Sequence, residues 1–283
     1  MKKLTDIGEV KRALERHGIV LSKGLGQNFL INPTVCPRMA EYCGADDSTG
    51  VLEIGPGIGV LTVELAKLAK RVVAIELDER LKPLLEENLE PYPNAQVVWG
   101  DAMKLNLPAL IEEHFSDCRR VVVCANLPYY ITSPIIMMLL EQRLPIESIT
   151  VMVQKEAAER MCAPVGSRES GAVTVAVHYH SVPSVLFSVS AGSFLPAPKV
   201  DSAVMKLEVL QQPPVDAGDE KQFRRLIKAG FSQRRKTLLN AVSAGGFSKE
   251  AAAAALDEMG LPRTARLEQL TLEQLAHLNR CLS

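Results

Sequence analysis

The chain has 283 residues, of which 47% are hydrophobic and 23% are charged, and its formal net charge is −1. This composition is that of a folded globular protein and excludes a long disordered region, while the length favours a large domain joined to a smaller one. The longest apolar stretch, residues 135–140, is far shorter than the roughly 20 residues that span a bilayer, so no membrane span is expected.

The charged residues are distributed unevenly along the chain. Residues 1–27 and residues 211–283 each carry an excess of three positive charges, whereas residues 28–210 carry an excess of seven negative charges. Basic flanks of this kind indicate a polyanionic partner, although solvated helix faces would explain the same excess.

The N-terminal segment, residues 1–27, is basic and lacks an uninterrupted apolar run, so no signal peptide is predicted and a cytoplasmic location is expected. The six cysteines are scattered without a CxxC pair and are expected to be reduced. His178 and His180 have no acidic or cysteine ligand at metal spacing, so no metal site is predicted.

Short apolar runs then alternate with amphipathic stretches, in the order expected of a parallel sheet covered by helices on both faces. Strands are predicted at residues 51–54, 72–76, 95–99, 120–125, 148–154 and 202–209. Helices are predicted at residues 59–69, 79–89 and 134–142. Right-handed crossovers between parallel neighbours give an α/β, Rossmann-like domain over residues 1–210. The stretch 171–180 is compatible with either a strand or a helix.

The paired prolines of Gln211-Gln212-Pro213-Pro214 cannot continue a strand or a helix, and they mark a linker. Beyond the linker the pattern is helical. Ser248 is a candidate N-cap, Gly260 and Pro262 would end that helix, and Thr271-Leu272-Glu273-Gln274 fits a capping box. Residues 211–283 are therefore expected to form a small all-helical domain.

The first predicted strand runs into a glycine-rich turn, Gly55-Pro56-Gly57-Ile58-Gly59, which lets the backbone bend sharply and a ligand approach closely. A nicotinamide fingerprint would need a third glycine where Val60 stands, so the spacing favours a cofactor without a pyrophosphate. Glu76 and Asp101 follow at the ends of the next two strands, where carboxylates can accept from ribose hydroxyls and from an adenine amine. A carboxylate there often only caps a helix, but three such features at successive strand ends indicate a cofactor site.

Asn126-Leu127-Pro128-Tyr129 follows the fourth strand and reaches the same edge of the sheet. A packed Asn-x-Pro turn is the purely structural alternative. The functional hypothesis is a site that holds adenine for transfer of a methyl group to its amine. This amine is a poor nucleophile, because its lone pair is delocalised into the ring. The Asn126 oxygen and a nearby main-chain carbonyl could accept its two N–H groups and direct the lone pair at the methyl group of S-adenosylmethionine. Tyr129 and Phe194 could stack on an extruded base, although a lone phenylalanine is more often part of a core.

These blocks, with Gly26-Gln27-Asn28-Phe29-Leu30 and the loop from Phe194 to Ser202, resemble the ribosomal RNA adenine dimethyltransferases of the KsgA type, in the family's order. The resemblance implies a seven-stranded, mostly parallel sheet with an antiparallel last strand, and a helical domain that helps to recognise a pre-assembled small ribosomal subunit. It also implies that Asn28 and Leu30 border the cofactor, alongside the glycine turn and Asn126. The implied substrate is two adjacent adenosines in a hairpin loop near the 3′ end of small-subunit (16S) RNA.

Seven basic residues and no acidic residue lie between positions 221 and 236: Lys221, Arg224, Arg225, Lys228, Arg234, Arg235 and Lys236. The first four share one face of a helix, where they repel one another unless an anion neutralises them. This pattern predicts contact with RNA phosphates, and a solvated helix face is the alternative.

Three other functions share some of these features. A large-subunit RNA methyltransferase of the antibiotic-resistance type would have the same chemistry, but such relatives tend to carry Ser in place of Gly26 and Ile in place of Leu127. A DNA adenine methyltransferase usually adds a target-recognition domain that residues 211–283 hardly provide. A ribosome-assembly factor without catalytic activity would not need Asn126 and Tyr129. We expect the protein to be a monomer.

Overall fold

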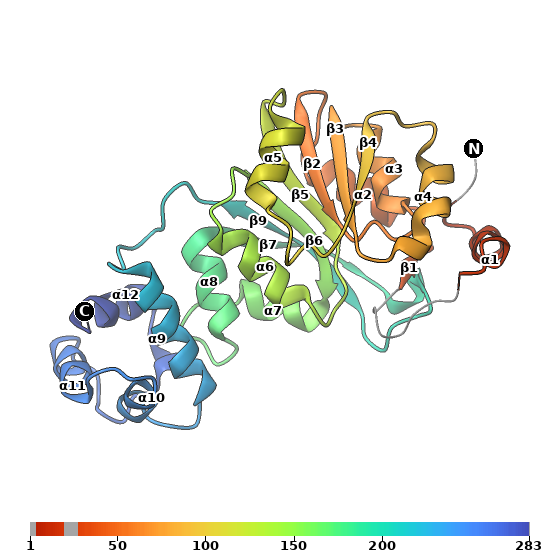
Figure 1. The fold of residues 1–283 in the computed structure, drawn as a ribbon. Coiled ribbons are helices and arrows are strands. Elements are labelled where there is room, and N and C mark those ends of the chain that lie inside the picture. Colours follow the sequence, from red (N-terminus) through yellow and green to blue (C-terminus); the bar gives the residue numbers. More distant parts are fainter. Residues whose placement is uncertain (1–3, 20–27, 283) are drawn as a thin grey trace. The chain divides into compact units, whose positions relative to one another are not determined.

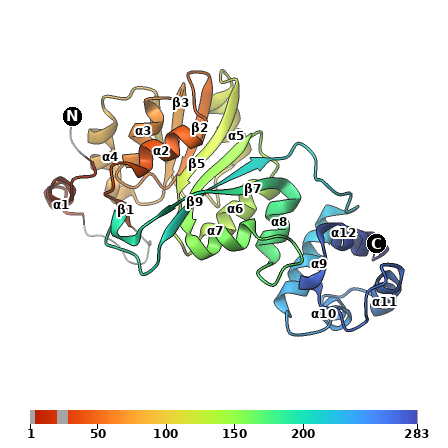
Figure 2. The ribbon, with the colours of Figure 1, turned by 180° about the vertical axis from the view of Figure 1, so that it is seen from behind.

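The computed structural model describes residues 4–19 and 28–282. Its contacts divide the chain into two units, Met1–Ala158 with Ser184–Val209 and Glu159–Pro183 with Leu210–Ser283. The first unit is built on a sheet flanked by helices, and the second is helical (Figures 1 and 2). This division differs from the single boundary expected after residue 210. Residues 159–183 group with the C-terminal helices because Val175 and Tyr179 share a buried core with Phe223 and Leu256.

The sheet has seven strands in the order β4-β3-β2-β5-β6-β9-β7. Their bounds are β2 (Thr49–Ile54), β3 (Arg71–Glu76), β4 (Ala95–Trp99), β5 (Arg120–Asn126), β6 (Ser148–Gln154), β7 (Ser181–Val189) and β9 (Ser202–Val209). Strands β2 to β6 pair in parallel, and β9 runs antiparallel to β6. The predicted fold class, with its antiparallel strand, is thereby confirmed. Sequence patterns missed β7, an edge strand that contains Pro183 and is largely exposed.

Helices cover both faces of this sheet (Figures 1 and 2). They are α2 (Val35–Tyr42), α3 (Val60–Ala66), α4 (Lys82–Leu89), α5 (Leu107–Phe115) and α6 (Thr132–Glu141). The helix α7 (Lys155–Cys162) follows β6 and contains the boundary between the two units. On one face, Met39 of α2 and Leu65 of α3 pack with Val51, Val72 and Val122 of the strands. The helix α1 (Ile7–Arg16) begins at Asp6, whose carboxylate accepts from the Glu9 amide, and its Val10 and Leu14 pack with residues of α4.

A second, two-stranded sheet joins distant parts of the first unit. The strand β1 (Phe29–Leu30) pairs antiparallel with β8 (Phe194–Leu195), with Leu30 opposite Phe194. Beside it, the Asn32 side-chain amide donates to the Ser193 hydroxyl at 3.1 Å, across 161 positions of sequence. This pairing fixes the segment around β1 next to the loop that precedes β9.

The second unit contains α8 (Ala172–His180), α9 (Glu220–Ser232), α10 (Leu238–Ala244), α11 (Lys249–Glu258) and α12 (Leu272–Cys281). The predicted caps are confirmed: the Ser248 hydroxyl accepts from the Ala251 amide at 3.1 Å, and Thr271 and Gln274 form a capping box. No helix in the described residues is both long and apolar enough to cross a bilayer.

The stretch for which sequence patterns allowed a strand or a helix is the helix α8. At its start, the Gly171 amide donates to the Thr174 hydroxyl at 2.9 Å, and that hydroxyl donates to the Arg160 carbonyl at 2.8 Å. Val175, Val177 and Tyr179 are buried. Tertiary packing and a local cap therefore override the preference of its β-branched residues for a strand.

Candidate active site

The glycine-rich turn connects β2 to α3. Gly55, Gly57 and Gly59 have φ angles of 72°, 59° and 86°, a conformation that residues with a side chain rarely adopt. A Cβ atom at Gly57 would also lie 3.2 Å from a ring carbon of Phe29. The turn can therefore be built only with glycine, and it leaves its backbone open to a ligand.

A pocket lies over this turn, at the C-terminal ends of the parallel strands. The predicted residues that line it are Asn28, Leu30, Gly55, Gly57, Glu76, Asp101, Asn126, Leu127, Pro128, Tyr129 and Phe194. All the residues predicted for the cofactor and for the target base are thus brought together in one pocket. Gly26 and Gln27, from the same N-terminal block as Asn28, lie outside the described residues.

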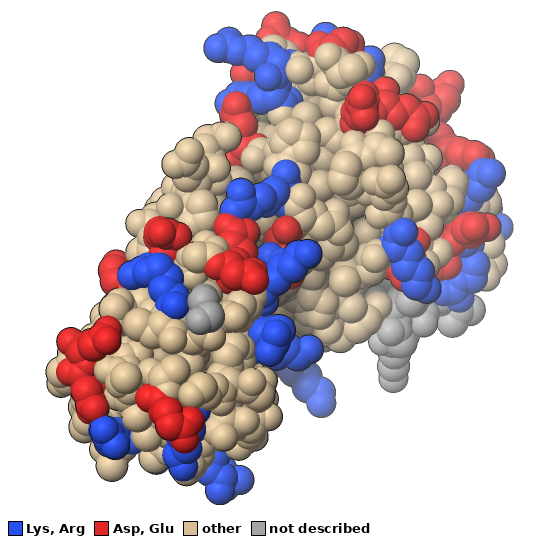
Figure 3. Space-filling model, turned by 60° about the vertical axis from the view of Figure 1, so that its left-hand side comes forward, with Lys and Arg blue, Asp and Glu red and all other residues tan. Residues whose placement is uncertain are grey.

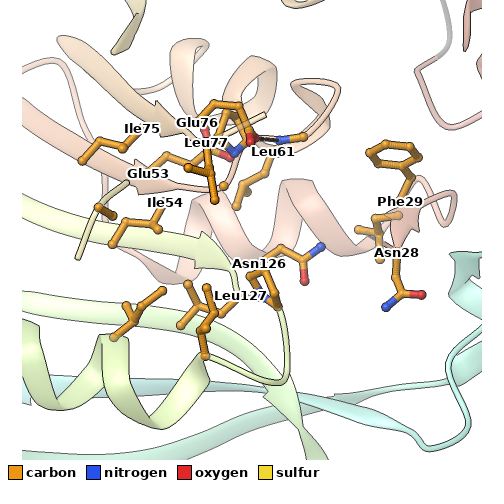
Figure 4. A pocket seen from close by; sticks show the side chains of 18 of the residues that line it. Asn28, Phe29, Glu53, Ile54, Leu61, Ile75, Glu76, Leu77, Asn126 and Leu127 are labelled. Atoms are coloured by element: carbon orange, nitrogen blue, oxygen red, sulfur yellow. Dashed lines mark hydrogen bonds between the residues drawn. The ribbon is translucent and has the colours of Figure 1, made fainter. Parts of the chain in front are cut away.

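Two main-chain donors fix the carboxylate of Glu76. The Gly57 amide donates to Oε2 at 3.1 Å, drawn as a dashed line in Figure 4, and the Asp78 amide donates to Oε1 at 2.8 Å. Burial of the side chain raises the pKa of Glu76, and these donors partly offset the effect. The carboxylate oxygens retain free lone pairs, so they can accept from neighbouring hydroxyls of a ribose.

Glu53, next to the last residue of β2, is a second acid in the wall of the pocket, and sequence reasoning gave it no role. Its side chain is only 1% exposed, and among the described residues its Oε2 atom has no hydrogen-bond partner. Burial, together with the nearby charge of Glu76, raises the pKa of Glu53 to about 8. The Glu53 carboxyl is therefore mostly protonated at neutral pH in the free protein.

Asn126 is the last residue of β5, and its side chain enters the open centre of the pocket opposite Asn28 (Figure 4). Among the described residues, the Asn126 amide group has no hydrogen-bond partner. The Pro128 carbonyl accepts from the Ile131 amide and the Thr132 hydroxyl, both at 3.2 Å, at the start of α6. The Leu127 carbonyl receives no such bond within the described chain. Asn126 Oδ1 and the Leu127 carbonyl are therefore two acceptors at this end of β5 that a ligand could use.

Tyr129 and Phe194 occupy different environments. The hydroxyl groups of Tyr129 and Ser202 lie 2.6 Å apart, and Ser202 is fully buried at the start of β9, so the tyrosine ring is held in place. Phe194 is 3% exposed and packs in the core with Leu30, while it also lines the pocket. A stacking role for both rings stays a prediction, and Phe194 has a structural role in any case.

Three large apolar residues at this pocket were not singled out from the sequence. Leu77, Met103 and Tyr130 line it and are 53%, 43% and 56% exposed. Each follows within two residues of a predicted site residue, and this position after a strand end was the available signal. Apolar walls of this kind suit the flat faces of purine rings.

The basic residues predicted to bind RNA lie on and after α9. Lys221, Arg225 and Lys228 are exposed, whereas Phe223 and Leu226 of the same helix are buried. Arg224 is half-buried, and Arg235 and Lys236 are exposed beyond the helix. Acidic side chains also lie on the visible surface of the helical unit (Figure 3). Six of the seven predicted basic residues are thus exposed, and the seventh, Arg224, is half-buried.

Arg234 has structural partners that its own segment of sequence did not reveal. Its Nε donates to Glu268 Oε2 at 2.6 Å, and its Nη2 donates to the Arg168 carbonyl at 3.1 Å. The sequence between positions 221 and 236 contains no acid, but folding supplies one from a distant position. This arginine is thus the least available of the seven for phosphate contact.

Comparisons with known proteins give consistent results. A family model described as ribosomal RNA adenine dimethylase matches residues 21–282. The ribosomal RNA small subunit methyltransferase A of Shouchella clausii is 45% identical over 272 residues, which cover 95% of this chain and 92% of that protein. The protein of the same name from Bacillus pumilus is 44% identical over 276 residues, covering 96% of this chain and 94% of that protein.

Two solved structures share the fold over most of the chain. A dimethyladenosine transferase from Plasmodium falciparum has a TM-score of 0.72 and 29% identity, and covers 88% of this chain and 95% of its own. The 23S rRNA methyltransferase ErmE has a TM-score of 0.68 and 29% identity, and covers 90% of this chain and 99% of its own.

Proposed function

This chain belongs to the ribosomal RNA adenine dimethylase family, and from this premise we propose the reaction that its pocket carries out. The protein is an S-adenosylmethionine-dependent methyltransferase that dimethylates adenine in 16S ribosomal RNA. Its target is two adjacent adenosines in a hairpin loop near the 3′ end. Loop bases are extruded at low cost, which suits a pocket that must receive one base at a time. The observation that carries the proposal is the pair of unpartnered acceptors, at Asn126 and Leu127, in the same pocket as the glycine turn.

The small subunit is favoured over the large subunit as the source of the RNA. Two named small-subunit methyltransferases are 45% and 44% identical over nearly the full chain, whereas the large-subunit enzyme ErmE is 29% identical. Asn126 and Tyr129 are both at the pocket, which supports catalysis over a purely structural role in ribosome assembly. The partner would be a pre-assembled small subunit in the cytoplasm, and the enzyme would act as a monomer.

The residues present fit S-adenosylmethionine. The glycine turn leaves its backbone open, Glu76 offers a fixed carboxylate for the ribose, and Leu77 and Met103 offer apolar contact for the adenine ring. Asp101, two residues after β4, would accept from the adenine amine. Leu30 of β1 and Asn28, just before this strand, would border the cofactor. When bound, S-adenosylmethionine supplies the electrophilic methyl group.

The protein acts on the target base mainly by positioning it. Asn126 Oδ1 and the Leu127 carbonyl would accept the two N–H groups of the amine, which localises its lone pair toward the cofactor side of the pocket. Tyr129, held by Ser202, would stack on the base. The amine releases one proton to solvent as it gains the methyl group, so one N–H remains after the first transfer. A single acceptor then suffices to orient the amine for the second.

We expect Glu76→Gln to raise the dissociation constant for S-adenosylmethionine by roughly 10- to 100-fold, because a hydrogen bond to a charged group contributes about 1.5–3 kcal/mol. The amide nitrogen of glutamine would also face one of the two main-chain donors that the carboxylate accepts. Titration calorimetry measures the change. Glu79→Gln removes an exposed carboxylate three residues away and should leave the affinity unchanged. An unaltered affinity in Glu76→Gln would refute the ribose contact.

We expect the triple variant Arg224→Gln, Arg225→Gln, Lys228→Gln to bind unmodified small subunits more weakly and with a flatter dependence on salt. Each lost phosphate contact should reduce the slope of log K against log salt by about 0.7–0.9. Filter binding at several salt concentrations measures both quantities. The control replaces the exposed residues Lys249, Arg263 and Arg266 of the same unit, with the same change in charge. Equal effects in the two variants would show that α9 has no special part in RNA binding.

The reaction itself is tested with labelled S-adenosylmethionine on three substrates: small subunits from a strain that lacks the modification, large subunits, and duplex DNA. The expected result is incorporation into small subunits only, with the label mapped to two neighbouring adenosines. Incorporation into large subunits would favour the antibiotic-resistance type of enzyme. Binding without incorporation would favour an assembly factor.

A further inference from the structure

Three possible metal ligands meet at the ends of two helices in the second unit. Glu258 is the last residue of α11, Cys281 is the last residue of α12, and His277 lies one turn before Cys281 on the same helix face. His277 Nε2 lies 3.1 Å from Glu258 Oε2 and 3.6 Å from Cys281 Sγ, and Cys281 Sγ lies 3.9 Å from Glu258 Oε2. Every pair of donor atoms is thus within contact distance.

These separations match those around a tetrahedral zinc ion. Zinc binds histidine nitrogen and carboxylate oxygen at about 2.0–2.2 Å and cysteine sulfur at about 2.3 Å, which places neighbouring donor atoms roughly 3.3–3.7 Å apart. The three separations differ from this range by a few tenths of an ångström at most. The combination of thiolate, imidazole and carboxylate also suits zinc better than magnesium or calcium, which prefer oxygen alone.

The helices hold these side chains in place without a metal. Leu256 of α11 and Leu275 and Leu278 of α12 are fully buried in the core of the helical unit. The capping box at Thr271 fixes the start of α12. The backbone that carries the three donors is therefore rigid, and little conformational freedom would be lost on binding an ion.

Two charged residues next to the cluster, Asp257 and Arg280, have partners of their own. Asp257 is paired with Arg263 at 2.7 Å, and the Arg280 guanidinium donates to the Asp216 carbonyl. Glu258, in contrast, contacts His277 and Cys281. Its carboxylate is 61% exposed and the His277 side chain is 34% exposed, so an ion can reach them from solvent.

We propose that Glu258, His277 and Cys281 bind a zinc ion that joins the end of α11 to the end of α12, with water as the fourth ligand. The proposal is independent of the methyltransferase reaction. It assigns the helical unit a structural metal site that histidine and cysteine spacing did not reveal, because the third ligand comes from a separate helix. The only local signal was the four-residue interval between His277 and Cys281.

The test uses the full-length protein, freed of metal with a chelator and titrated with zinc in competition with a chromophoric chelator. Cobalt serves as a spectroscopic probe, since a tetrahedral site with a thiolate gives strong visible bands and a charge-transfer band in the near ultraviolet. The expected result is one ion per chain. Cys281→Ser should abolish the charge-transfer band. Each of the variants Cys281→Ser, His277→Gln and Glu258→Gln should weaken zinc binding by at least about tenfold. A loss of this size follows even when the replaced residue only supports a metal ligand.

Cys118→Ser is the matched control. Cys118 Sγ also lies 3.9 Å from a carboxylate, that of Asp117, but this carboxylate is paired with Lys70 and Arg71. The control should bind zinc as the parent protein does. The proposal is overturned if the parent binds no stoichiometric zinc, or if Cys281→Ser binds it equally well. Should a variant unfold, alkylation of the parent protein decides: zinc must protect Cys281, and unchanged labelling refutes the site.

Discussion

Replacing Asn126 with alanine is expected to slow methyl transfer by roughly 10²- to 10³-fold, the loss that follows when one preorganised hydrogen-bonding group is removed from a transition state. The affinity for S-adenosylmethionine should change little, because Gly57 and Glu76 form the cofactor side of the pocket independently of this side chain. Single-turnover kinetics with saturating cofactor measures the rate, and calorimetry measures the affinity. The loss should therefore appear in the rate constant of the chemical step.

Asn106→Ala is the control for this variant. Asn106 caps α5, where its side chain accepts from the Ala109 amide at 3.2 Å, and it does not line the pocket. Its removal costs stability, about 1 kcal/mol, but should leave turnover intact. A rate for Asn126→Ala close to that of the parent would show that the amine is oriented by other groups.

Glu53→Gln is expected to remove a large dependence of stability on pH. Below the ordinary glutamate pKa of 4.5, the Glu53 carboxyl is protonated in both the folded and the unfolded chain. From there up to about pH 8 the unfolded chain loses this proton and the folded chain keeps it. The free energy of unfolding therefore falls by about 1.4 kcal/mol per pH unit, and by on the order of 4 kcal/mol in all. Glutamine does not ionise, so the variant should lack this loss.

The measurement is urea unfolding at pH 5, 6, 7 and 8, followed by the fluorescence of Trp99. The chain has one tryptophan, on β4, so the signal reports the unit that contains Glu53. The slope of the free energy of unfolding against pH is compared between variants, since an effect of the substitution that is the same at every pH does not change this slope. Glu41→Gln, at an exposed position of α2, should keep the slope of the parent. Parallel slopes for Glu53→Gln and the parent would mean that Glu53 is ionised in the folded protein.

Sequence patterns predicted the centre of the sheet well because β2, β3, β5 and β6 are almost entirely buried and read as continuous apolar runs. The strands β4, β6 and β9 have the predicted bounds. The edge strand β7 escaped prediction because its exposed face carries no such signal. The helix α8 could not be decided either, since its conformation depends on packing against α9 and on a cap from Thr174.

The site was predictable where its residues follow strand ends. Glu76, Asp101 and Asn126 lie there, and parallel topology alone brings them together. Asn28 was different. The pairing of β1 with β8 brings this residue to the pocket and joins segments at the two ends of the first unit, so no local pattern predicts it. Only the family resemblance indicated Asn28. The partner of Arg234 was hidden for a similar reason, since Glu268 lies 34 positions away.

The pairing of Leu30 with Phe194 also has a consequence for biosynthesis. The glycine turn, Glu76 and Asn126 are all translated before β8, but the segment that carries Asn28 has no strand to pair with until residue 195 has been added. In a nascent chain that ends before residue 195, the segment with Asn28 would therefore not be fixed at the pocket. The methyl donor would be enclosed on one side only. Full affinity for the donor is expected to arise late in translation, when the two edges of the pocket first meet.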